Sequence, residues 1–120
     1  MPNSAKTTTF PEPAGAVSVE QQWQLDNAAP GASPRPFRCF DGRSWLVELP
    51  GTHRDITVRI TGIQYADGVV QRAVVVDRLD GYDDLLPVAK AQELARVLMA
   101  AVDEAQRMDA RDCAVHHAGG

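Results

Sequence analysis

The sequence has few cysteines, few aromatic residues and no long apolar run. No segment approaches the roughly 20 apolar residues of a membrane-spanning helix, and the N-terminus lacks the basic region and apolar core of a secretory signal. We therefore expect a cytoplasmic protein without a membrane partner. The two cysteines, Cys39 and Cys113, are too few for a disulfide framework. We expect two separate thiols, with a bridge between them as the alternative.

Signatures of catalysis and of cofactor binding are also missing. The chain contains no phosphate-binding glycine loop, dinucleotide fingerprint, zinc-protease helix motif or nucleophile elbow. Cys113, His116 and His117 form the only group of metal-binding residue types, and a zinc site needs four ligands, usually from two clusters. These absences predict no enzyme activity, no catalytic residues, no cofactor, no metal site and no small-molecule substrate.

Charge is spread unevenly over a chain whose formal net charge is -4. Residues 35–78 hold seven arginines and five acidic residues, whereas residues 79–120 hold four basic and eight acidic residues. The part predicted to form strands is therefore mildly basic and the part predicted to form a helix is acidic. This imbalance is smaller than that of a typical nucleic-acid-binding domain.

Composition divides the 120 residues into an arm, one domain and a tail. Residues 1–34 are rich in proline and small residues, which bury too little surface to offset the entropy of ordering, so we expect a flexible, mostly disordered arm. Within it, residues 17–25 alternate apolar and polar side chains around Trp23, which suggests either an edge strand, a short helix or a loose segment. Residues 35–109 are expected to form an α+β domain, and residues 110–120 a disordered tail.

The strands are predicted from alternation and from turn dipeptides. Asp41-Gly42 and Asp67-Gly68 both favour type I′ hairpin turns, so residues 37–40 should pair with 43–49, and residues 56–65 with 69–77. The apolar parity changes at Gly62, which predicts a β-bulge around residues 61–62. Counting that bulge as one extra residue sets the register of the second hairpin. The expected neighbours are Ile60 with Val74, Val58 with Val76, and Tyr65 with Val70.

A helix is predicted over residues 86–108. Apolar residues recur there with the 3.6-residue period, and Pro87 suits the first turn. The face expected to be buried comprises Ala91, Leu94, Ala95, Leu98, Val102 and Ala105. The predicted fold is therefore α+β: a three- to four-stranded antiparallel β-meander packed against one long C-terminal α-helix, with a flexible N-terminal arm.

The layout of residues 43–108 resembles a group of small proteins from high-GC actinobacteria and their phages. The resemblance rests on three features: Ile60-Thr-Gly-Ile-Gln-Tyr-Ala-Asp-Gly, Arg72-Ala-Val-Val-Val, and an alanine-rich helix entered through Leu86-Pro87. It implies a β-meander, a D-G turn and a closing helix, and an accessory or host-interacting role related to phages or mobile elements. No functional residue is carried over, because the shared motifs are structural.

These observations favour a small non-enzymatic protein-interaction module that binds another protein or itself, in the latter case as a homodimer. The core is small, and apolar residues such as Val97 and Met99 lie at the margin of the predicted buried face. The alternative is a nucleic-acid-binding regulator that uses the basic side of the sheet, with aromatic rings that stack on bases. Arg72 is expected to extend toward solvent at the end of the sheet. The candidate interaction residues are Trp23, Trp45, Arg59, Arg72, Val97 and Met99.

Overall fold

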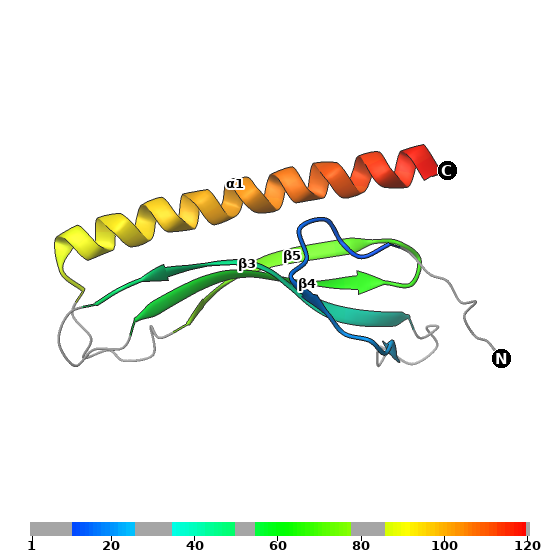
Figure 1. Cartoon of the computed structure of the whole chain (residues 1–120), viewed down its shortest axis with the longest axis horizontal. Coiled ribbons are helices and arrows are strands. Elements are labelled where there is room, and N and C mark those ends of the chain that lie inside the picture. The colour runs from blue at the N-terminus through cyan, green and yellow to red at the C-terminus, as the bar shows by residue number, and fades with distance from the viewer. Residues whose placement is uncertain (1–10, 26–34, 50–54, 78–85, 120) are drawn as a thin grey trace.

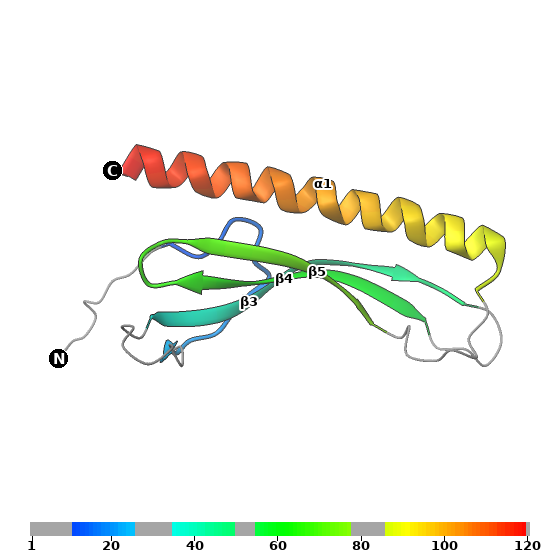
Figure 2. The same cartoon turned by 180° about the vertical axis from the view of Figure 1, so that it is seen from behind.

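An antiparallel sheet and one long helix across its face make up the computed structural model, which describes residues 11–25, 35–49, 55–77 and 86–119 (Figure 1). The elements are β1 (Ser18–Val19), β2 (Gln24–Leu25), β3 (Pro36–Val47), β4 (Ile56–Tyr65), β5 (Val70–Asp77) and α1 (Val88–Gly119). The strand order is β1-β3-β4-β5, with β2 also paired to β3, so β5 forms one edge of the sheet (Figure 2). The predicted α+β class, an antiparallel sheet packed against a C-terminal helix, is confirmed.

The central strand β4 alternates without interruption. Ile56, Val58 and Ile60 are buried under α1, and Gly62 and Gln64 continue the same buried face. The predicted bulge at residues 61–62 is therefore wrong. Position 62 instead requires a glycine because the ring of Phe40 lies over it. A Cβ built there would stand 2.5 Å from the ring's Cζ.

The irregularity lies on β3, where the sequence predicts a type I′ turn. Asp41-Gly42 forms no hairpin, because β3 runs without a break from Pro36 to Val47. The pairing shifts between Asp41 and Ser44, which leaves Gly42 and Arg43 opposite the single residue Ile60. This bulge allows Phe40 before it and Val47 after it to point to the same buried face.

The β4–β5 register matches the prediction at Val58 and Ile60 but not near the turn. Ile60 pairs with Val74 and Val58 with Val76. The extra residue lies in the turn, where the N–H of Tyr65 donates to Val69 O (2.8 Å) and Gly68 adopts a φ of 97°. This is a three-residue loop with a left-handed glycine. As a result Gln64, rather than Tyr65, pairs with Val70.

The helix is longer than predicted and is rotated about its axis. It begins at Val88, where Pro87 O accepts the N–H of Ala91 (2.8 Å), and continues to Gly119 through the segment predicted to be a disordered tail. Leu94, Ala101 and Met108 are buried, whereas three members of the predicted face are exposed. Those three are Ala91, Ala95 and Val102.

Part of the N-terminal segment fills the space between the sheet and the C-terminal half of α1 (Figure 1). Pro13 is buried there, and Gly15, with a φ of 72°, lies against Met108: a Cβ at Gly15 would stand 2.6 Å from its sulfur. The chain then pairs with β3 through β1 and β2. Residues 1–10 and 26–34 of the predicted arm lie outside the described residues.

Candidate interaction surface

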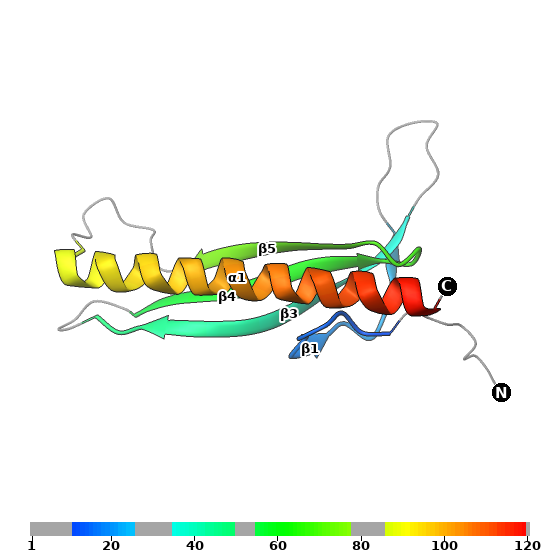
Figure 3. The ribbon, with the colours of Figure 1, turned by 90° about the horizontal axis from the view of Figure 1, so that it is seen from above.

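One exposed side of α1 carries a row of apolar residues. Val88, Met99 and Val102 are 85%, 62% and 38% exposed. Together with exposed Ala91 and Ala95 they follow one another at three- or four-residue steps, so they share one side of the helix. We call these five residues the helix stripe. Seen from above, α1 is the uppermost element and no described element lies over it (Figure 3).

The helix stripe exists because the apolar arc of α1 is wider than the part that the sheet covers. Val97 and Leu98 pack against the core formed by Val47, Ile56 and Val58. The two predicted interaction residues on this helix therefore lie in different environments. Val97 belongs to the core, and Met99 belongs to the exposed surface.

Both tryptophans are engaged within the chain. Trp45 packs against the core, and the guanidinium carbon of Arg43 lies 4.9 Å from its ring centroid. Trp23 is half-buried, with the guanidinium carbon of Arg38 at 4.6 Å. An arginine over an aromatic face is attracted by the ring's quadrupole. The two rings thus help to hold the sheet's own arginines in place.

Arg59 and Arg72, the two predicted basic candidates, lie on opposite faces of the sheet. Arg59 is on the face away from α1, where it contacts Asp41 Oδ1 (2.8 Å) and Asp77 Oδ2 (3.4 Å). Two carboxylates surround this one cation. Because neighbouring acids already balance Arg59 and α1 covers Arg72, these two residues do not form one basic patch for nucleic acid.

Arg72 is a buried cation that joins three parts of the chain. Its side chain is 2% exposed and forms ion pairs with Asp109 and Asp112 of α1. It also donates to Ala14 O (3.0 Å), and its guanidinium carbon lies 5.4 Å from the Phe40 ring centroid. Asp112 accepts the N–H of Ala14 at Oδ1 (2.8 Å). Its Oδ2 forms the ion pair with Arg72 and accepts no hydrogen bond from the described residues. We call these residues the Arg72 cluster.

The sequence contains a signal for the Arg72 cluster. Asp109 and Asp112 are three residues apart, which places them on neighbouring positions of a helix, but this holds only if the helix extends beyond residue 108. The expectation that Arg72 extends toward solvent is wrong, because the N-terminal segment and α1 enclose it.

Both cysteines are free thiols, so the alternative of a Cys39–Cys113 bridge is wrong. Cys39 is half-buried and Cys113 is exposed. Burial, followed by the nearby carboxylate of Glu20, raises the pKa of the Cys39 thiol. The pKa of Glu20 is lowered in turn, first because its carboxylate accepts the backbone N–H of Cys39 (2.8 Å).

The raised pKa of Cys39 predicts selective alkylation. Because the thiolate is the reactive form, we expect Cys39 of the folded protein to react with iodoacetamide at pH 8 at least several times more slowly than Cys113. Peptide mass spectrometry over a time course measures both rates. Unfolding in urea should remove the difference, and equal rates in the folded protein would contradict the expectation.

Among the described residues there is no group of three or more His, Cys, Asp or Glu side chains that could hold a metal ion. Within the same ranges, no helix has the length and hydropathy needed to span a membrane. No family model, curated protein or solved structure matches the chain.

Proposed function

We propose that this protein is a small, non-enzymatic interaction module that self-associates through the helix stripe. The observation that carries the proposal is the exposure of Met99 and Val102 on a helix whose other side is well packed. Burying an apolar side chain of this size contributes about 1.5–3 kcal/mol when the burial is complete. A partner that covers the helix stripe would gain much of this energy.

The size of the helix stripe sets the expected affinity of self-association. A contact confined to one side of a helix falls in the class of small interfaces, which bury less than about 1,200 Å² in total. We therefore propose a reversible homodimer with a dissociation constant in the micromolar range. The free thiols of Cys39 and Cys113 support a reducing compartment, the cytoplasm. The resemblance to small actinobacterial and phage proteins supports an accessory role.

Replacing Met99 by lysine tests this function. A charge at the centre of the helix stripe would have to be desolvated on association, so we expect Met99→Lys to be monomeric at concentrations where the unmodified chain dimerises. Size-exclusion chromatography with light scattering, over a concentration series that spans the micromolar range, measures the mass of each.

Leu46→Lys is the matched control. Leu46 is also an exposed apolar residue, 54% exposed, but it lies on the opposite face of the sheet from α1. This variant should associate like the unmodified chain. A chain that stays monomeric over the whole range would overturn the proposal, as would equal loss of association in both variants.

A further inference from the structure

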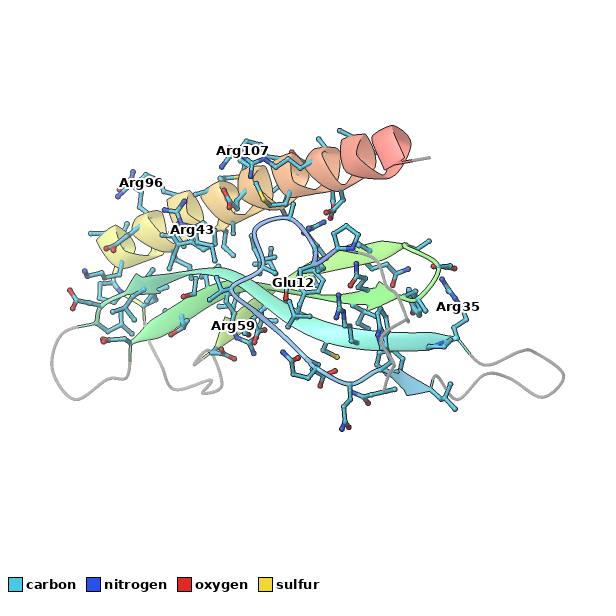
Figure 4. The ribbon with its side chains drawn as sticks, turned by 45° about the vertical axis from the view of Figure 1, so that its right-hand side comes forward. Glu12, Arg35, Arg43, Arg59, Arg96 and Arg107 are labelled. Carbon is cyan, nitrogen blue, oxygen red and sulfur yellow. The ribbon has the colours of Figure 1, made fainter. Side chains whose placement is uncertain are left out.

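Two opposite charges flank the helix stripe without a partner among the described residues. Arg96 and Asp103 are seven residues apart, which is about two helical turns, so they lie along the same side of α1. Neither forms an ion pair or hydrogen bond with any residue in the described ranges. Figure 4 shows Arg96 extending from α1 away from the sheet (Figure 4).

Most other charges of the helix differ in this respect, and Arg111, which also has no partner among the described residues, lies more than three turns from Met99. Lys90 pairs with Glu93 (3.2 Å) and Arg107 with Glu104 (2.6 Å), each within one turn of α1. Asp109 and Asp112 belong to the Arg72 cluster. Arg96 and Asp103 are therefore the pair of opposite charges beside the helix stripe that is available to a partner.

We propose that a second copy of this chain docks on the helix stripe with its helix antiparallel, so that Arg96 contacts the partner's Asp103 and Asp103 contacts the partner's Arg96. This inference rests on the proposed self-association and adds its geometry. A two-fold interface is reciprocal: if residue i contacts residue j, then j contacts i. An antiparallel pair therefore forms two ion pairs, whereas a parallel pair would place like charges side by side.

The apolar residues fit the same arrangement. Pairing residue 96 with residue 103 places the two-fold axis beside Met99, so the two methionine side chains meet at the centre of the contact. Ala95 of each copy then lies two residues along the axis from the partner's Val102, about 3 Å at the helical rise, which sets a small residue beside a larger one. Small side chains allow helices to approach to the usual separation of about 8–10 Å. Shape and charge thus select the same register.

Charge variants test the orientation on the full chain. Arg96→Glu places a carboxylate opposite the partner's Asp103, and Asp103→Lys places an ammonium group opposite the partner's Arg96. Each exchange turns two attractive contacts into repulsive ones, so we expect each variant alone to raise the dissociation constant about tenfold at low salt. An equimolar mixture of the two variants should return to the unmodified value. In the mixed dimer the new carboxylate lies opposite the new ammonium group, and the remaining Arg96 lies opposite the remaining Asp103.

Analytical ultracentrifugation measures the dissociation constants, and circular dichroism checks that each variant is folded. Arg111→Glu is the control: Arg111 is exposed on the same helix and the substitution makes the same charge change, but the register places it opposite Val88. Its dissociation constant should stay within about twofold of the unmodified value. Raising the ionic strength to about 0.5 M should reduce the differences between variants, because exposed charges are screened.

The outcomes separate the two proposals. Weakening by both single variants with recovery in the mixture supports the antiparallel dimer. If Met99→Lys abolishes association but the mixture shows no recovery, self-association stands and the antiparallel register is overturned. If the unmodified chain never dimerises, both proposals are overturned.

Discussion

Replacing Arg72 with alanine should lower the free energy of unfolding by about 3 kcal/mol. The substitution leaves Asp112 close to the sheet with no cation beside it, removes the hydrogen bond to Ala14 O, and opens a space over Phe40. The value is at the low end for a broken buried ion pair, because Asp109 keeps access to water. Urea denaturation followed by circular dichroism measures the change, and the melting temperature should fall by roughly 10–15 °C.

Arg59→Ala is the matched control for this experiment. Arg59 lies on β4 of the same sheet and also contacts two carboxylates, one from β3 and one from β5, but it does so at the open face. Exposed ion pairs contribute little, so we expect a loss of less than about 1 kcal/mol. Similar losses for Arg59→Ala and Arg72→Ala would show that enclosure of the Arg72 cluster adds nothing to stability.

Adding one methyl group at Gly62 should cost about 2–3 kcal/mol. The new Cβ would stand 2.5 Å from both the Phe40 ring and the backbone oxygen of Gln71. The ring could turn away, but the carbonyl belongs to the paired strand β5 and could move only by distorting the sheet. Gly62→Ala should therefore unfold at a lower urea concentration with an unchanged denaturant slope.

Gly42→Ala provides the comparison. A Cβ at Gly42 would meet Ile60 Cβ at 3.2 Å, a contact that a small shift of the bulge relieves. We expect a loss of less than about 1 kcal/mol, since alanine is also tolerated at a non-left-handed position. Equal effects at the two glycines would contradict the assignment of Gly62 as the site of close packing.

The main elements could be predicted from the sequence because their signals are local. The Asp67-Gly68 dipeptide marks the β4–β5 hairpin, and the apolar period marks α1. The position of the bulge was harder to predict because both Gly42 and Gly62 are plausible sites for it. Gly62 suggests a bulge, but a glycine is needed there because the Phe40 ring packs against it. The change of parity between Phe40 and Val47 is the better signal, and it places the bulge on β3.

The surface was less predictable because it depends on how α1 is rotated over the sheet. Periodicity indicates one apolar stripe centred near Leu98, and the prediction assumes that this whole stripe is buried. The structure turns the helix so that Ala101 and Met108 face inward. This leaves Ala91, Ala95 and Val102 outside, next to Met99. Contacts with the N-terminal segment, distant in sequence, accompany that rotation, and no local pattern contains them.

The Arg72 cluster also orders the steps of biosynthesis. Arg72 precedes Asp109 by 37 residues, so at about 5–20 residues per second a ribosome adds the first balancing carboxylate roughly 2–8 s later. During that interval the nascent β5 carries a cation on the face that will become the interior. The N-terminal segment, although synthesised first, acquires its anchor at Asp112 last. Its contacts with Gln64, Arg72 and β3 involve residues that have already been made by then, so the hydrogen bond to Asp112 is the one that waits for the end of α1.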